Sequence, residues 1–421
     1  MPPVLVEYPQ CSRGPWISNP LARGADGVLR YGNLNPALTE LLDVQVHAFS
    51  AREAVVEVGG PRLTYRQLWH AAARIAGGLQ EHGIGYGDRV AVKMPVGASW
   101  VQAFLGALLS GAVPVLVADG LSDAAASRVL ADSSADFVLD GGGPEYGYSR
   151  FPDGAAFIDD GASLTELALL CYTSAETPAG APRGVELTNE NLLSAVRSMV
   201  GALNLPTDGL RNLVLAPLAH ASGCVDQVLP TFAVGGTVVL VPDSARIAET
   251  LTGGQIDMVS TTPRTVAGLL PQLSEVRAEG VKQVCLASHR SEVGPSEAAR
   301  SERGPAPTVG AVLRRMFPRA QQWSVWGATE TSGIGLACAG DLPDGAVHGR
   351  DVLGLPFGGT ELALWGPAAD SGHGELLCRG PNVSRRYWND PQTTSSRFTG
   401  TWFHTGNEVR IDADGLVHRV A

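Results

Sequence analysis

Lysine is nearly absent from this 421-residue chain, in which Lys93 and Lys282 are the only two. A reaction that needs a lysine amine therefore has just two candidates, and the other basic residues are arginines. Basic residues are also in the minority, because 31 of them face 42 acidic ones and leave a formal net charge of −11. A protein of this charge repels polyanions, which argues against a nucleic acid or an anionic membrane surface as a partner.

Charged residues as a whole are few, at 17%, while hydrophobic residues make up 44%. This balance is typical of a globular protein with a buried core. Cysteines spaced as metal ligands or as a redox pair are missing, since the six form no CxxC motif. Four of them sit in apolar runs, which favours buried free thiols in a reducing compartment over disulfides or zinc. The six are Cys11, Cys171, Cys224, Cys285, Cys338 and Cys378.

No secretory signal is visible, because the first residues lack a basic stretch followed by an apolar one. We therefore expect a cytoplasmic protein. The uncharged run over 94–118 is long enough to cross a bilayer. Proline and glycine at 95, 97, 111 and 114 divide it, so we predict a helix at about 98–110, a buried strand at 113–117 and no membrane span.

Short apolar or β-branched runs alternate with helical patterns from about residue 60 onward. The predicted strands are 88–93, 113–117, 136–139, 167–171, 213–216, 237–241, 258–261 and 281–287, and helical patterns cover 65–80, 188–203 and 263–273. Strands that are apolar on both faces and separated by helices indicate parallel sheets covered on both sides. These strands exceed one sheet, so we predict an α/β fold with two doubly wound, mostly parallel sheets covered by helices.

The pattern changes at both ends of the chain. After about residue 340, glycine and proline become frequent and short strands dominate, at 361–364, 374–378, 402–404 and 416–419. This indicates a small antiparallel, barrel-like subdomain. We predict an irregular N-terminal arm over 1–45, α/β subdomains over 46–200 and 201–340, and the small β subdomain over 341–421. A polar stretch at 291–308, rich in glycine, proline and charge, is predicted to be a mobile loop.

The stretch most informative about function covers residues 170–185. An apolar strand pattern leads into threonine, serine and small residues, then into Arg183 and Gly184, and a helical pattern opens at Thr188. A strand, a small-residue loop, a basic residue and a helix together form a backbone cradle for polyphosphate. Glu176 departs from this pattern, because it places a carboxylate inside the cradle.

Three further stretches accompany this loop. Residues 324–331 (Ser-Val-Trp-Gly-Ala-Thr-Glu-Thr) end a strand with an aromatic, a glycine, a hydroxyl and a carboxylate. Residues 374–388 form a strand and turn, and 402–407 (Trp-Phe-His-Thr-Gly-Asn) precede a hairpin signal at 412–415. With the loop and 216–223 (Ala-Pro-Leu-Ala-His-Ala-Ser-Gly), their order and spacing resemble the adenylate-forming superfamily over roughly residues 45–421. Its members are acyl-CoA synthetases, adenylation domains of peptide synthetases, and luciferases.

The resemblance implies attack of a small-molecule carboxylic acid on the α-phosphorus of Mg-ATP, and then transfer of the acyl group to a thiol of CoA or a carrier protein. The catalytic residues would be Thr329 at the α-phosphate, Glu330 as the Mg²⁺ ligand, Arg183 and His220. The other residues implied to bind ATP are Thr173, Ser174, Thr177 and Gly184 at the phosphates, Trp326 stacked on adenine, Gly327 and Ala328 beside the base, and Asn407 at the ribose. The acyl pocket would be lined by His220, Cys224, Ala287, Ser288 and His289.

The phosphate loop departs from the family pattern, which usually reads Thr-Ser-Gly-(Ser/Thr)-Thr-Gly-x-Pro-Lys-Gly. Ala175 and Pro178 replace glycines, Glu176 replaces a hydroxyl residue, and Arg183 stands for the lysine. Pro178 donates no amide, so cradling is lost at that point. A carboxylate about 4 Å from a phosphate costs about 4 kcal/mol at a partly buried site.

Two further departures concern the ribose and the acyl pocket. Asn407 stands where an aspartate is usual, and its amide lacks the charge that strengthens a bidentate contact. Residues 287–289 (Ala-Ser-His) replace Gly-Gly-Ala, which narrows or re-polarises the pocket and implies a shorter or more polar acyl group, or none.

The resemblance also implies a small mobile C-terminal domain that carries a catalytic lysine and follows soon after the ribose residue. This chain ends at Ala421, so we expect it to lack that domain, through truncation or a natural end. Three functions stay open: an ATP-dependent acyl-adenylate ligase, a pseudoenzyme or binding module of the same fold, and acyl transfer or ring closure on an already activated acyl substrate. The retained Glu330 and Arg183 favour the first.

Overall fold

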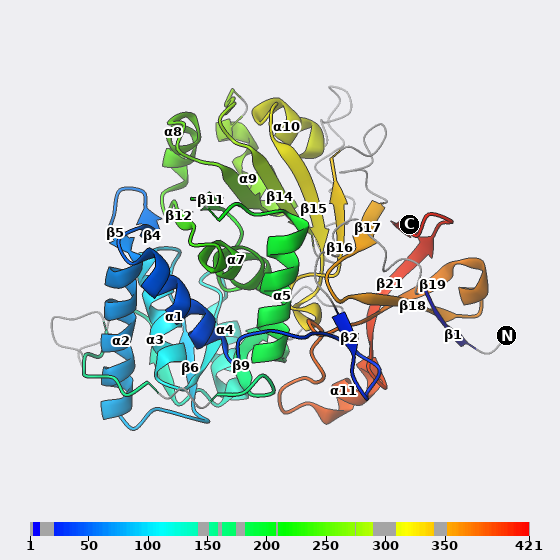
Figure 1. The fold of residues 1–421 in the computed structure, drawn as a ribbon, viewed down its shortest axis with the longest axis horizontal. Coiled ribbons are helices and arrows are strands. Elements are labelled where there is room, and N and C mark those ends of the chain that lie inside the picture. Colours follow the sequence, from blue (N-terminus) through cyan, green and yellow to red (C-terminus); the bar gives the residue numbers. More distant parts are fainter. Residues whose placement is uncertain are drawn as a thin grey trace.

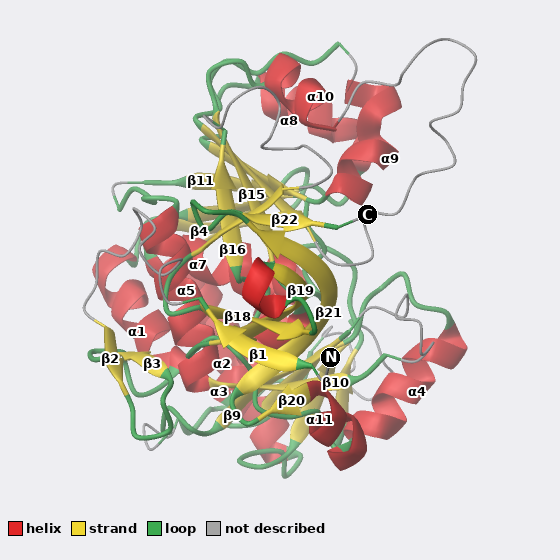
Figure 2. Ribbon diagram, turned by 90° about the vertical axis from the view of Figure 1, so that its right-hand side faces the viewer, coloured by secondary structure: helices red, strands yellow, loops and turns green. Residues whose placement is uncertain are grey.

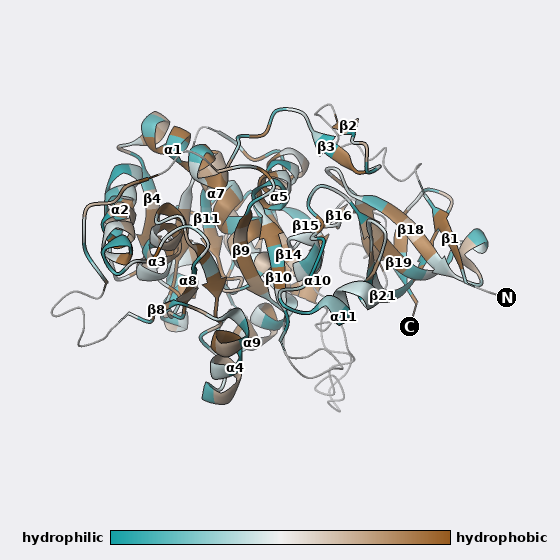
Figure 3. Cartoon of the chain, turned by 90° about the horizontal axis from the view of Figure 1, so that it is seen from below, coloured by the Kyte–Doolittle hydropathy of each residue, from teal (hydrophilic) through white to brown (hydrophobic). Residues whose placement is uncertain are grey.

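The computed structural model describes residues 3–8, 21–141, 151–158, 162–173, 182–207, 209–273, 275–288, 309–340 and 352–420. Two sheets and three layers of helices alternate, and an antiparallel β unit lies at one end of the molecule (Figure 1). Figure 3 shows that the apolar residues follow the inner strands, such as β9, β11 and β14. The predicted α/β class with two helix-covered sheets is therefore confirmed.

The first sheet has the order β10-β9-β7-β6-β8. Its strands are β6 (Arg89–Val92), β7 (Val113–Leu116), β8 (Phe137–Leu139), β9 (Leu167–Tyr172) and β10 (Gly184–Thr188). All pairs are parallel except β9 with β10, which is antiparallel. The parallel strands carry almost continuous apolar residues, because helices cover both faces of this sheet.

The second sheet contains the parallel series β4, β12, β11, β13, β14 and β15, with β5 and β16 added antiparallel at its ends. Its strands are β4 (Glu53–Glu57), β5 (Arg62–Thr64), β11 (Arg211–Val214), β12 (Thr237–Leu240), β13 (Met258–Thr261), β14 (Gln283–Ser288), β15 (Gln321–Trp326) and β16 (Leu336–Ala339). Although β4 and β5 come early in the chain, β4 pairs with β12, so the second sheet includes strands from the predicted 46–200 stretch.

The helices are α1 (Leu38–Phe49), α2 (Tyr65–Glu81), α3 (Ala98–Leu109), α4 (Asp123–Ser133), α5 (Asn189–Ala202), α6 (Ala221–Gly223), α7 (Leu229–Ala233), α8 (Ile247–Thr252), α9 (Pro263–Leu273), α10 (Val309–Met316) and α11 (Pro391–Arg397). One hydrophobic cluster joins α2, α3, α5 and α7 to both sheets, so these helices form the middle layer. A second cluster packs α8, α9 and α10 on the far face of the second sheet, and a third packs α4 on the first sheet (Figure 2).

The uncharged run at 94–118 divides as predicted, into α3 and the buried strand β7. In the part of the chain that the structure describes, no helix combines the length and apolarity that a bilayer span requires. Five of the six cysteines are buried and free, as predicted, and Cys11 lies outside the described residues.

The C-terminal β unit consists of β17 (Val352–Pro356), β18 (Glu361–Gly366), β19 (His373–Arg379), β20 (Phe398–Thr399), β21 (Trp402–Ile411) and β22 (Val417–Arg419). The predicted hairpin at 412–415 joins β21 to β22. Among the described strands the pairing is an open path and not a closed barrel. Strand β17 pairs with both β16 and β22, so the unit continues the second sheet.

The N-terminal stretch is more regular than the sequence suggests. Strand β1 (Val4–Glu7) lies antiparallel to β18, and β2 (Leu21–Arg23) forms a hairpin with β3 (Leu29–Tyr31). Such short strands give little periodic signal in the sequence, because whether they form depends on the strand with which they pair. The polar stretch predicted as a loop at 291–308 lies outside the described residues.

Candidate active site

The predicted phosphate loop joins two antiparallel strands. Tyr172 at the end of β9 pairs with Gly184 at the start of β10. The Thr173 amide donates to the Arg183 carbonyl at 3.0 Å, and the Arg183 amide donates to the Thr173 hydroxyl at 3.0 Å. These bonds clamp the two ends of the loop. Ser174, Glu176, Thr177 and Pro178 lie outside the described residues.

The expected order of strand, loop and helix needs a correction here, because β10 lies between the loop and α5. Residues 184–188 (Gly-Val-Glu-Leu-Thr) alternate in polarity, and this period-2 pattern favours a strand. Helix α5 then begins at a capping box, in which the Thr188 hydroxyl accepts from the Asn191 amide at 3.3 Å and the Asn191 side chain accepts from the Thr188 amide at 2.9 Å. The loop therefore leads into a strand and does not adjoin the N-terminus of α5.

Arg183 and Gly184 are held by residues from a distant part of the chain. The Arg183 guanidinium lies 3.5 Å from the Asp390 carboxylate, and both side chains are about one-third exposed. The Trp388 amide donates to the Gly184 carbonyl at 2.8 Å. A Cβ on Gly184 would lie 3.1 Å from both Tyr172 and Trp388, which leaves little room for a side chain at this position.

The predicted metal ligand, Glu330, lies in a short 3₁₀ turn directly after β15 and is 7% exposed. The Tyr387 hydroxyl donates to its Oε1. Burial, reinforced by the negative charge of Glu330, raises the pKa of Tyr387, so this hydroxyl stays protonated as a donor. The second carboxylate oxygen has no hydrogen-bond partner among the described residues.

Residues 380–390 connect the base of the loop to Glu330. The Ser384 amide donates to the Glu330 carbonyl at 2.7 Å, and the Ser384 hydroxyl donates to the Glu186 carbonyl of β10 at 2.8 Å. The Asn382 side chain donates to the Thr331 carbonyl at 3.0 Å. Tyr387 also forms a β-bridge with Val185. The 380–390 segment therefore brings the loop base and the carboxylate together, a role that the sequence did not reveal.

Trp326, predicted to stack on adenine, is only 1% exposed. Its ring packs in a hydrophobic cluster with Leu336 and Phe403, so stacking on a base would require that the ring be uncovered, and it stays a prediction. The next residue, Gly327, passes so close to Gly333 that a Cβ would lie 1.9 Å from the Gly333 carbonyl oxygen. The half-buried Thr329 follows, and its hydroxyl has no hydrogen-bond partner among the described residues.

Asn407, predicted at the ribose, lies in an irregular part of β21. Leu377 faces His404 and Glu375 faces Glu408, so β21 carries extra residues opposite β19 at this point. A bulge of this kind re-aims side chains. The Asn407 side-chain amide donates to the Thr405 carbonyl at 3.3 Å, and its Oδ1 has no partner among the described residues.

The predicted acyl-pocket residues divide into buried and accessible ones. Cys224 and Ala287 are at most 1% exposed, and burial raises the pKa of the Cys224 thiol. His220 and Ser288 are half-buried, and Ser288 pairs with Trp326 at the ends of β14 and β15. His289 lies outside the described residues. The ends of β9, β14 and β15 therefore carry most of the predicted site, as is usual for ligand sites of parallel sheets.

The comparison with known proteins decides the family. The model of the AMP-binding enzyme family matches residues 42–388, which is more than half of the chain. The chain belongs to this family. The resemblance to the adenylate-forming superfamily that the motifs carry is thereby confirmed.

Relatives of this chain include a feruloyl-CoA synthase of an Amycolatopsis species, 28% identical over 398 residues that cover 88% of this chain and 76% of that protein. A 2-succinylbenzoate–CoA ligase of Bacillus velezensis is 28% identical over 384 residues, covering 85% and 72%. Among solved structures, O-succinylbenzoate coenzyme A synthetase of Bacillus subtilis in complex with AMP superposes with a TM-score of 0.76 at 22% identity, covering 92% of this chain and 98% of that one.

One carboxylate of this family member escaped the sequence analysis. Asp226 lies in a π-helix over Cys224–Val228, is 1% exposed, and has no partner for either carboxylate oxygen among the described residues. Burial raises its pKa well above the ordinary value. Gly333, with φ of +84°, packs against it, and a Cβ there would lie 2.2 Å from Oδ1. The available signal was a carboxylate inside an apolar run, which did not distinguish it from a surface residue.

Proposed function

We propose that this protein activates a carboxylic acid with ATP. A carboxylate oxygen of the acid would attack the α-phosphorus of ATP. The bond from that phosphorus to the oxygen that bridges the α- and β-phosphates would break, which yields the acyl adenylate and free pyrophosphate. A thiol of CoA or a carrier protein would then take the acyl group and release AMP. A cytoplasmic location would supply ATP and keep the buried thiols reduced.

The observation that carries this proposal is the hydrogen bonding of the Glu330 carboxylate. Its carboxylate is held by Tyr387 through one oxygen, while the other has no partner among the described residues. Mg²⁺ prefers carboxylate oxygens and binds through one or two of them plus substrate phosphates. The donor set thus fits Mg²⁺, which would neutralise charge that develops on the phosphates.

The neighbouring side chains suit the parts of ATP that we assign to them. The guanidinium of Arg183 would donate to phosphate oxygens. Arg183 stands at the base of the loop, which the 380–390 segment connects to Glu330. The Thr329 hydroxyl, which has no partner among the described residues, would donate to the α-phosphate. The Oδ1 of Asn407 would accept one hydroxyl of the ribose. None of these roles requires a lysine.

Calorimetric titration tests nucleotide binding directly. We expect the full chain to bind Mg-ATP at millimolar concentration or below, and Glu330→Gln to weaken Mg-ATP more than ATP in the presence of EDTA. Glu249→Gln is the control, because Glu249 is an exposed residue of α8. Absence of Mg-ATP binding to the wild-type chain would contradict the proposal.

Pyrophosphate exchange then tests turnover. Because the relatives act on feruloyl, succinylbenzoyl and oxalyl groups by their names, the panel should include ferulic, 2-succinylbenzoic and oxalic acids. Exchange that depends on one acid identifies the substrate class. Mg-ATP binding without exchange for any acid would instead favour a nucleotide-binding module.

A second candidate, a binding module that does not hold ATP, is favoured by two contacts. Arg183 is already paired with Asp390, and Trp326 is covered by apolar side chains. The calorimetric result separates the candidates, because the module would show no heat of Mg-ATP binding.

A further inference from the structure

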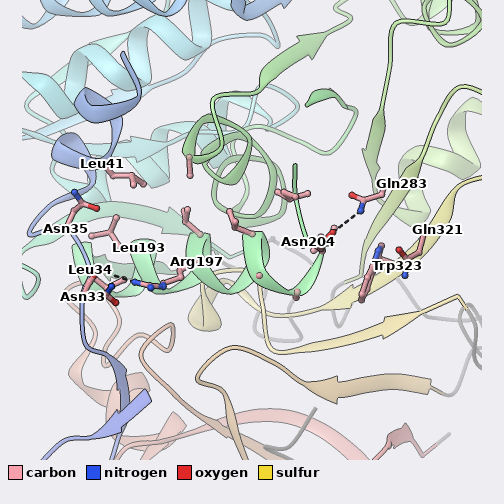
Figure 4. Close-up of a pocket in the computed structure, with 17 residues that line it drawn as sticks. Asn33, Leu34, Asn35, Leu41, Leu193, Arg197, Asn204, Gln283, Gln321 and Trp323 are labelled. Atoms are coloured by element: carbon pink, nitrogen blue, oxygen red, sulfur yellow. Dashed lines mark hydrogen bonds between the residues drawn. The ribbon is translucent and has the colours of Figure 1, made fainter. Parts of the chain in front are cut away.

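A cavity of about 770 Å³ runs along α5 and includes none of the residues assigned to the candidate active site (Figure 4). Its size lies within the range of small-molecule sites, which is about 300–1,000 Å³. The lining residues come from the segment before α1, from α1, from α5 and the three residues that follow it, from α7, and from the first residues of β14 and β15. They are Asn33, Leu34, Asn35, Leu41, Leu193, Val196, Arg197, Val200, Gly201, Ala202, Leu203, Asn204, Leu205, Ala233, Gln283, Gln321 and Trp323.

The long wall of the cavity is one face of α5. Residues 193, 196, 197, 200 and 201 follow the helical spacing i, i+3, i+4, i+7 and i+8, so they line up along one side of the helix. Three of these residues are leucine or valine, and Leu41 and Ala233 stand on other helices that line the cavity. This wall would accept the apolar body of an elongated ligand.

Polar side chains lie toward the two ends of the cavity. Figure 4 shows Asn33, Asn35 and Arg197 toward one end, and Asn204, Gln283, Gln321 and Trp323 toward the other. The amide of Gln283 donates to the Leu203 carbonyl at 2.8 Å, while its Oε1 is buried and has no partner among the residues that the structure describes. An apolar wall with a few convergent polar groups is the usual composition of a small-molecule site.

Charge decides what kind of ligand this cavity suits. Among the described residues that line it, Arg197 is the one that carries a charge, and none is a carboxylate. Its guanidinium donates to the Asn33 carbonyl at 3.0 Å and lies 5.3 Å from the centre of the Tyr31 ring, so it is held in place beside the cavity. A cation on a partly apolar wall attracts an anion and disfavours a cation.

We propose that this cavity is a second small-molecule site, which binds an amphipathic organic anion. The anionic group would pair with Arg197, and the apolar body would lie along the α5 face toward Gln283. Strands β14 and β15 both begin at this cavity and end at the candidate active site. Since each has six residues, the two sites are separated by roughly 17 Å of strand.

Helix α5 also gives the second site a physical connection to the first. Asn191, near the start of α5, donates to the carbonyls of Pro381 and Val383 at 2.8 and 3.2 Å. Those residues belong to the 380–390 segment, whose Tyr387 binds Glu330. A ligand that packs on the α5 face would therefore contact the helix that anchors this segment.

Fluorescent probes test the site on the full chain. The anionic probe is 8-anilinonaphthalene-1-sulfonate, and the uncharged probe of similar shape is N-phenyl-1-naphthylamine. We expect both to bind saturably with one probe per chain. Arg197→Gln should weaken the anionic probe at least tenfold and leave the neutral probe unchanged, because it removes the charge and keeps a polar side chain at this position. Arg128→Gln, on the exposed face of α4, is the matched control and should change neither.

Filling the cavity tests its location. Val200→Trp on α5 and Ala233→Leu on α7 should each abolish or weaken the binding of both probes. The two residues lie on different walls, so the test still works if one of the variants misfolds. Thermal unfolding identifies any variant that fails to fold. Four results would overturn the proposal: non-saturable binding, equal weakening of both probes by Arg197→Gln, undiminished binding in both folded filling variants, or sedimentation showing a dimer whose dissociation creates probe binding.

Discussion

Asp226 offers the sharpest physical test of the structure, through replacement by asparagine. Both oxygens of this carboxyl are buried and unpartnered among the described residues, so the charged form is disfavoured. Asparagine has almost the same shape and cannot ionise. The Asp226→Asn variant therefore removes one proton-binding group while it leaves the packing against Gly333 nearly unchanged.

The size of the effect follows from proton linkage. Because burial raises the pKa of Asp226 above 3.8, the folded chain keeps this proton at pH values where the unfolded chain has lost it. Unfolding then releases one proton, so the folded state loses stability as the pH rises. From about pH 4 upward, each pH unit should favour unfolding of the wild type about tenfold more than that of Asp226→Asn. The difference becomes constant above the pKa of the folded state.

Urea unfolding at several pH values between 4 and 8, followed by tryptophan fluorescence, measures this difference. The wild type should lose stability relative to Asp226→Asn with increasing pH, and the break in the difference gives the pKa of Asp226 in the folded chain. Asp119→Asn changes an exposed aspartate and should give a profile parallel to the wild type. A constant difference between wild type and Asp226→Asn over this range would refute the reasoning, since Asp226 would then be ionised and paired.

Three other predictions concern the candidate site. Tyr387→Phe removes the donor to Glu330 and should lower the free energy of unfolding, measured by urea titration, by about 2 kcal/mol. It should also weaken Mg-ATP binding in calorimetry. Unchanged stability would show that this hydrogen bond contributes nothing. Asn382→Ala removes the side-chain donor to the Thr331 and Ile334 carbonyls in a buried site and should cost about 1–3 kcal/mol, measured by the same urea titration. Glu176→Gly should tighten ATP binding in calorimetry if the loop covers the phosphates, and unchanged affinity would mean that it does not.

The fold was predictable where the pattern is local. The strands β7, β9 and β13 and the helices α2, α3 and α9 lie where apolar runs and helical periodicity predict them, because a buried parallel strand and an amphipathic helix each leave a clear period in the sequence. Strand β10 was missed although its five residues alternate in polarity. The expectation of a helix after a phosphate loop outweighed this short signal.

The candidate site was predictable in its motifs but not in its connections. Tyr387 and Glu330 are 57 positions apart, and the sequence around either residue gives no sign of their hydrogen bond. The burial of Trp326 likewise depends on packing against Leu336 and Phe403, which lie on other strands. Contacts of this kind depend on tertiary packing, so one sequence without its fold cannot predict them.

Pairing between the two ends of the chain has a consequence for how the protein is made. Strand β1 pairs with β18, and the Tyr8 hydroxyl donates to the Ala369 carbonyl, 361 positions away, at 2.7 Å. At a synthesis rate of roughly 5–20 residues per second, β1 waits about 20–70 s on the ribosome before its partner is made. Strand β1 is therefore translated long before the strand with which it pairs, and a fluorophore beside β1 would report when β18 has joined it.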